Sequence, residues 1–187
     1  MALVAAQQLG NKLLYENISH FVLGATSPDI RSIVNRPREQ YHFAELDFDG
    51  IGSGVRGMFS THPELTDSSN IDASTVSFIA GYITHILLDE SWITEVFRPV
   101  FGNEEIFPDA VQGNIADRAL QLELDRQTQN SWNDMIDLVE GAAMPVAVPF
   151  IDPESLEQWR NWLLQLLGMG FNWDRLNFMA RKIAGGD

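Results

Sequence analysis

The chain contains no cysteine among its 187 residues. Disulfides, thiolate metal ligands and a cysteine nucleophile are therefore excluded, and any transition-metal site must use histidine and carboxylate side chains. Basic residues are also scarce, because 12 Lys and Arg stand against 26 Asp and Glu, which gives a formal net charge of -14. This balance argues against a general nucleic-acid-binding surface and against docking on anionic lipid, but it leaves room for a local acidic cluster that holds a cation.

Long hydrophobic runs are absent as well. No window approaches the roughly 18 uncharged apolar residues of a transmembrane helix. Residues 1–14 lack the basic start and long apolar core of a signal peptide, so we expect a cytoplasmic location. The length predicts one domain over residues 1–187. The oligomeric state is left open.

Strand signals are few, whereas helical periodicity is common. Residues 144–151 alone lean toward β structure, and their two prolines predict an extended connector. Residues 74–93 are apolar on nearly every side, which predicts a central buried helix capped by Asp72 or Ser74. Amphipathic patterns predict further helices, mainly in residues 112–185, over 112–127, from 132 to about 141, from 153 to about 168, and over 172–183. We therefore expect an all-α, single-domain bundle of six to eight helices, with loops over 26–37, 47–57 and 61–70.

Candidate chemistry centres on four histidines: His20, His42, His62 and His85. Only His85 has a carboxylate four residues on, at Asp89, and this spacing puts both side chains on one helix face. A buried Asp is costly unless it is paired or bound to a metal. The pair therefore predicts a shared cation, with two alternatives: a His–Asp hydrogen bond in the core, or an Asp89 turned to water.

The candidate metal-site motifs all lie within residues 20–95. Two further clusters precede the His85–Asp89 pair in this range. The first is a Gly-Ala-Thr-Ser-Pro-Asp segment that ends at Asp29, where Pro28 fixes the backbone and Gly24 allows close packing or a turn. The second places His42 between aromatic residues and acidic ones. Each has a plain structural alternative: Asp29 as a helix cap, and His42 as part of a half-exposed aromatic face.

Together these segments resemble the zinc-dependent phospholipase C family, which is related to the fungal single-strand-specific nucleases. The resemblance covers about the first 100 residues: a Gly-x-x-x-Pro-Asp turn, a following histidine, and a Gly-Tyr-x-x-His-x-x-x-Asp helix. It implies an all-α fold of the phospholipase C and nuclease type. It also implies one metal site built by Asp29, His42, His85 and Asp89.

The sequence departs from the family at the other metal sites. No histidine lies in residues 1–16 and none follows His85. Glu95, Asp117 and Glu123 are the candidate additional ligands. We therefore expect one ion and at most two: zinc, with manganese or iron as alternatives. His20 is expected in a surface or capping role, and His62 in an exposed loop.

The resemblance implies a metal-dependent hydrolase of phosphate esters acting on a small phosphoester or a phospholipid. In that function Asp29 is the candidate catalytic base. Arg31, Arg36 and Arg38 are candidate phosphate ligands, because arginine presents a planar fork of donors. The alternative is a non-catalytic binding or assembly protein on the same scaffold, with a structural metal or none. A closed four-ligand site favours a structural metal, and a site with a position left for water favours an enzyme.

Overall fold

The computed structural model describes residues 2–142 and 146–185. Its described part is an all-α, single-domain bundle, as predicted, and it contains no β-strand, only an isolated bridge between Val148 and Ile151. The predicted connector 144–151 is thus described from residue 146 onward, and residues 144 and 145 lie outside. None of the helices in the described part combines the length and hydropathy needed to cross a membrane.

The N-terminal half is built from short helices around one long one. The short elements before it are α1 (Ala2–Leu9), α2 (Lys12–Glu16), α3 (Ile18–Gly24), η1 (Ser27–Ile30), α4 (Arg31–Val34), α5 (Glu39–His42), α6 (Ser53–Thr61), η2 (Pro63–Thr66) and η3 (Ser68–Asn70). The long helix is α7 (Ala73–Trp92), which continues into the π-helical segment η4 (Ile93–Phe101). Asp72 caps α7 by accepting a hydrogen bond from the Thr75 N–H at 3.0 Å, as predicted.

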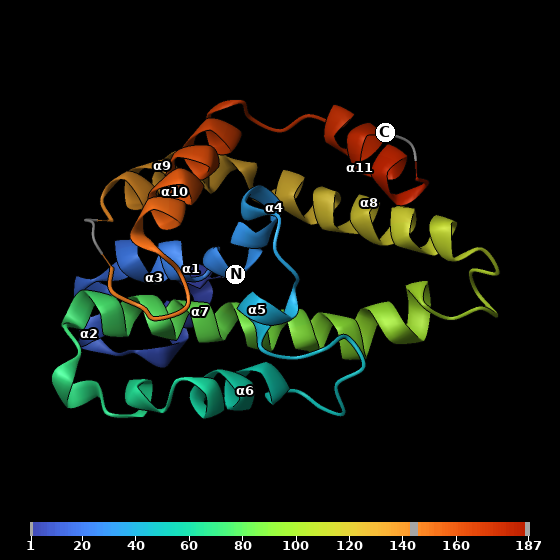
Figure 1. Cartoon of the computed structure of the whole chain (residues 1–187). Coiled ribbons are helices and arrows are strands. Elements are labelled where there is room, and N and C mark those ends of the chain that lie inside the picture. Colours follow the sequence, from blue (N-terminus) through green and yellow to red (C-terminus); the bar gives the residue numbers. More distant parts are fainter. Residues whose placement is uncertain (1, 143–145, 186–187) are drawn as a thin grey trace.

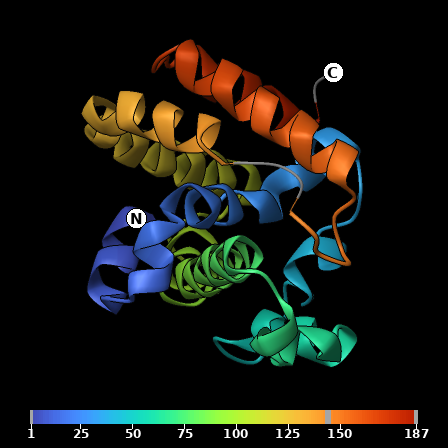
Figure 2. The ribbon, with the colours of Figure 1, turned by 90° about the vertical axis from the view of Figure 1, so that its left-hand side faces the viewer.

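The C-terminal half contains the predicted regular helices. They are α8 (Ala110–Thr128), the short η5 (Gln129–Ser131), α9 (Trp132–Glu140), α10 (Pro153–Gly168) and α11 (Asp174–Ile183). In Figure 1, α7 and η4 run the length of the molecule, α8 returns above them, and α11 lies on α8. Figure 2 looks along α7. The N-terminal helices lie beside it in this view, α6 lies below it, and the later helices lie above it. The expectation of a central buried helix is confirmed.

Three details of the sequence prediction were wrong. The described residues form eleven α-helices rather than six to eight, because short helices fill segments predicted as loops. Residues 27–34 are η1 and α4, and α6 begins inside the glycine-rich segment 47–57. His20 is only 9% exposed, and the His62 side chain only 18%. His20 is therefore buried and His62 half-buried, so the expected surface role of His20 and exposed position of His62 were wrong. A capping role, the other expectation for His20, stays a prediction.

The closest packing in the fold is the crossing of α3 over α7. A Cβ atom on Gly81 would lie 1.9 Å from the Phe21 carbonyl oxygen, and one on Gly24 would lie 2.0 Å from the Phe78 carbonyl oxygen. Both distances are far below van der Waals contact, so only glycine allows the two backbones to approach this closely. The large side chains Phe21, Phe78 and Tyr82 are fully buried beside the crossing.

Replacing Gly81 by Ala should destabilise the protein by about 1–3 kcal/mol, the usual cost of overpacking. The matched control is Gly168→Ala at the end of α10, where a Cβ would meet no atom within 4 Å. Alanine is the better helix former, so the control should be neutral or gain up to about 1 kcal/mol. Urea unfolding measures both, and equal midpoints for the two variants would contradict the proposed role of the crossing.

Candidate metal centre

Three of the four predicted ligands converge. Asp29 lies on η1, His42 ends α5 and His85 lies in the middle of α7. One ligand atom from each lies within 4.8 Å of one from each of the others, and the described residues contain no second group of this kind. Asp29 is exposed, His42 is 2% exposed, and the His85 side chain is 17% exposed. The group thus has a buried side and a side open to solvent.

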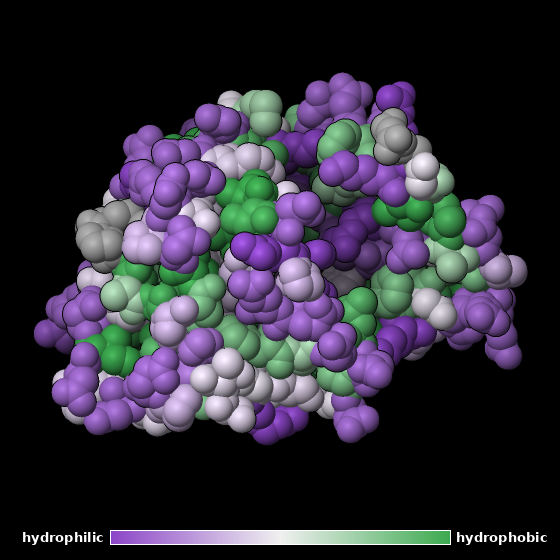
Figure 3. All heavy atoms as spheres, viewed as in Figure 1, coloured by the Kyte–Doolittle hydropathy of each residue, from purple (hydrophilic) through white to green (hydrophobic). Residues whose placement is uncertain are grey.

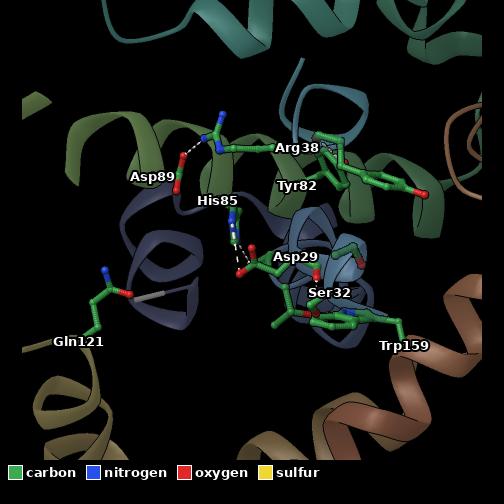
Figure 4. Close-up of polar contacts among 12 residues, drawn as sticks. Asp29, Ser32, Arg38, Tyr82, His85, Asp89, Gln121 and Trp159 are labelled. Carbon is green, nitrogen blue, oxygen red and sulfur yellow. Dashed lines mark hydrogen bonds and ion pairs between the residues drawn. The ribbon is translucent and has the colours of Figure 1, made fainter. Parts of the chain in front are cut away.

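The imidazole of His85 is oriented by the α3–α7 crossing. Its Nδ1 lies 2.8 Å from the carbonyl oxygen of Ala25, the residue that follows α3. A carbonyl only accepts, so Nδ1 carries the proton and the neutral ring keeps a lone pair on Nε2. That Nε2 atom lies 3.9 Å from Asp29 Oδ2. Figure 4 shows the two side chains pointing toward one another from α7 and η1.

The His42 side chain is buried and its Nδ1 has no hydrogen-bond partner in the described part of the chain. Burial, together with the nearby Arg38, His85 and Arg31, lowers the pKa of His42 to about 2. The ring is therefore neutral at ordinary pH, which is the form that binds a metal. A buried polar atom without a partner needs an explanation, and a bound cation supplies one. Two imidazoles and a carboxylate also form a donor set suited to zinc.

Asp89, the fourth predicted ligand, is placed differently. It does not belong to the converging group, and its Oδ2 accepts a hydrogen bond from Nη2 of Arg38. Burial raises the pKa of Asp89, and the Arg38 guanidinium opposes that rise. Figure 4 shows this ion pair beside His85 along α7. The sequence analysis offered a shared cation, a hydrogen bond to His85 or an Asp89 turned to water. It missed Arg38 because the two residues are 51 positions apart.

The three candidate additional ligands do not join the group. Asp117 is 4% exposed and accepts hydrogen bonds from Trp92 Nε1 at 2.8 Å and from Gln121 Nε2 at 2.9 Å. Glu123 accepts hydrogen bonds from Arg126 and Gln127, which hold its pKa at about 2. Glu95 is exposed on η4. These contacts give no support to a second metal site in the described part of the chain.

The converging group opens into a cavity of about 630 Å³ between α7, η4 and α8, called here the α7–α8 cavity. The space-filling view shows the surface hollowed here, with hydrophilic side chains around the opening (Figure 3). Of the three candidate phosphate ligands, Arg31 and Arg38 line the cavity and Arg36 does not. Trp92, Phe97 and Leu124 supply an apolar wall. The cavity therefore offers a metal-ligand group, positive charge and an apolar surface together.

Comparisons with protein-family models, with curated proteins and with solved structures found no match for this chain. A function for the chain must therefore be inferred from the geometry of the site and from the three sequence motifs that build it.

Titration of the purified chain with Zn²⁺ should saturate near one ion per chain. The physical reason is that the carboxylates of Asp117 and Glu123 are already engaged by protein donors, which a second ion would have to displace. Elemental analysis after dialysis measures the ratio. Three well-occupied ions would contradict the expectation and would show that these carboxylates rearrange around metal.

Proposed function

We propose that the protein is a metal-dependent hydrolase of phosphate esters, on a fold of the zinc-dependent phospholipase C and nuclease type. The observation that carries the proposal is the convergence of Asp29, His42 and His85 from three separate segments. The convergence occurs at a cavity that is also lined by arginines. Zinc is the ion that fits this donor set best, with manganese and iron as alternatives.

A divalent ion bound by these side chains would supply a Lewis acid for a phosphoryl oxygen and for the attacking water. The remaining chemistry belongs to the chain. Asp29 is the exposed member of the group, with its side chain 58% accessible, so it can take a proton from a water at the mouth of the cavity. The Ala25 carbonyl fixes the His85 ring, so that Nε2 does not rotate away.

Arg31 is the candidate phosphate ligand. It is exposed, lines the α7–α8 cavity two residues after Asp29, and makes no side-chain hydrogen bond or ion pair within the described ranges. Its guanidinium is thus available for a substrate oxygen, and a planar fork of donors suits phosphate. The apolar wall across the cavity can accept the organic part of an ester. These features support a small phosphoester with an apolar group, and a phospholipid belongs to that class.

The openness of the site favours an enzyme over the non-catalytic alternative. A structural metal is usually enclosed by four protein ligands, whereas a catalytic one keeps a position for water or substrate. Here three side chains converge at a cavity that is accessible from solvent.

Asp29→Asn should lower the hydrolysis of a chromogenic phosphodiester or phosphomonoester by on the order of a hundredfold or more, the usual contribution of a positioned general base. In the wild type, Zn²⁺ at 100 times its Kd should add about 2.7 kcal/mol to the free energy of unfolding. At about 2–4 °C per kcal/mol for a chain of this size, that raises Tm by about 5–10 °C. Asp29→Asn and His85→Ala should lose most of this rise.

The matched control is Asp134→Asn, an exposed aspartate in the first turn of α9. It should keep both activity and the zinc-dependent rise in Tm. If Zn²⁺ leaves the wild-type Tm unchanged, the metal centre itself is refuted. If Zn²⁺ raises Tm but no phosphoester is hydrolysed, the site holds a structural metal and the binding-protein alternative is correct.

A further inference from the structure

The contact between Arg38 and Asp89 fixes both side chains. Arg38 precedes α5, its Nη2 donates to Asp89 Oδ2, and its Nη1 donates to the Ala44 carbonyl oxygen at 3.1 Å. The Arg38 side chain is only 10% exposed and that of Asp89 31%. An arginine keeps its charge at every ordinary pH, so Asp89 has a permanent cationic partner with or without a metal.

Asp89 nevertheless lies close to the candidate metal centre. It follows His85 by one helical turn on the same face of α7, and it lines the α7–α8 cavity together with Asp29 and His42. The spacing alone would allow it to share an ion with His85. In the structure it lies outside the converging group of three and is paired with Arg38 instead.

We infer that Arg38 is a positioning residue that withholds Asp89 from the metal, so that the ion has three protein ligands instead of the four that the family resemblance implies. Three protein ligands leave a coordination position for water or substrate, as catalytic zinc sites require. Without Arg38, Asp89 is a half-buried carboxylate in need of a cation, and the metal is the nearest one. This inference rests on the metal centre of the proposed function and is independent of the substrate.

The test measures the Zn²⁺ Kd of the full chain by competition with a chelator, for the wild type and three variants. Arg38→Met releases Asp89, and its Kd should fall at least tenfold. Arg38→Met combined with Asp89→Asn replaces the ion pair by a neutral pair of similar size, and its Kd should stay within about threefold of the wild type. If Arg38 had only a structural role, its replacement by Met would not make the protein bind Zn²⁺ more tightly.

Arg98→Met is the matched control for charge. Arg98 lines the same cavity, but its guanidinium donates to the carbonyl oxygens of Leu46 and Phe48 and not to Asp89. Removing it takes the same positive charge out of the cavity without releasing a carboxylate. Its Kd should change less than threefold. If Arg98→Met and Arg38→Met gained Zn²⁺ affinity equally, the cause would be the loss of positive charge in general. That result would overturn the inference.

A second measurement reads the coordination directly. With Co²⁺ in place of Zn²⁺, the visible absorption of the wild type and the double variant should coincide, and that of Arg38→Met should differ because a ligand has been added. The double variant also guards against misfolding, since it leaves no unpaired buried charge.

The possible results separate the two proposals. If the double variant binds Zn²⁺ far more weakly than the wild type, Asp89 is itself a ligand and the inference is wrong, while the proposed metal centre stands. If Arg38→Met binds no more tightly than the wild type, the inference is also wrong. If the wild type binds no Zn²⁺ at all, the inference and the metal centre fail together.

Discussion

The site depends on the close approach of α3 and α7. Because Gly24 and Gly81 leave no side chain between the two backbones, the carbonyl oxygen of Ala25 reaches Nδ1 of His85. This contact sets which ring nitrogen is free and where it points. At the end of α3, the Ser27 hydroxyl donates a hydrogen bond to the Leu23 carbonyl oxygen at 2.7 Å, which ties the start of η1, the element that carries Asp29, to α3. Two members of the candidate metal centre are therefore positioned from the end of α3.

His42, the third member of the candidate metal centre, is positioned through α6, which is bound to α7 by Glu90. The carboxylate of Glu90 is 1% exposed and accepts hydrogen bonds from the backbone N–H groups of Gly52 and Gly54 at the start of α6. A carboxylate suits a helix N-terminus, where backbone N–H groups lack partners. A Cβ on Gly54 would lie 2.2 Å from the carbonyl oxygen of His42, so α6 packs directly against the end of α5. Helix α7 thus positions all three side chains, through His85 itself, through α3, and through α6.

These contacts explain how far the sequence could predict the structure. Helix α7 was predictable because its cap at Asp72 and its apolar run are local signals. Helix α6 was not, since its glycines disfavour a helix by intrinsic propensity, and contacts that are distant in the sequence, with α5 and α7, offset this. The His85 to Asp89 spacing correctly placed two polar side chains on one face. The partner of Asp89 is Arg38, and a contact over 51 residues leaves no local pattern to read.

The net charge of the chain and the arginines of the α7–α8 cavity bear on which phosphoesters the proposed site could bind. The formal charge of -14 gives the molecule a field that attracts metal cations and slows the approach of polyanions. Within that field, four of the 12 basic residues line the α7–α8 cavity: Arg31, Arg38, Arg98 and Arg118. They balance the cavity's own aspartates locally, and a bound divalent ion would make the site net positive. A small monoanionic or dianionic phosphoester gains from this local charge and loses little to the distant field, whereas an extended nucleic acid must bring many phosphates against the acidic surface. For the proposed phosphoesterase, the distribution of charge therefore favours a small phosphoester over a polymer as the substrate.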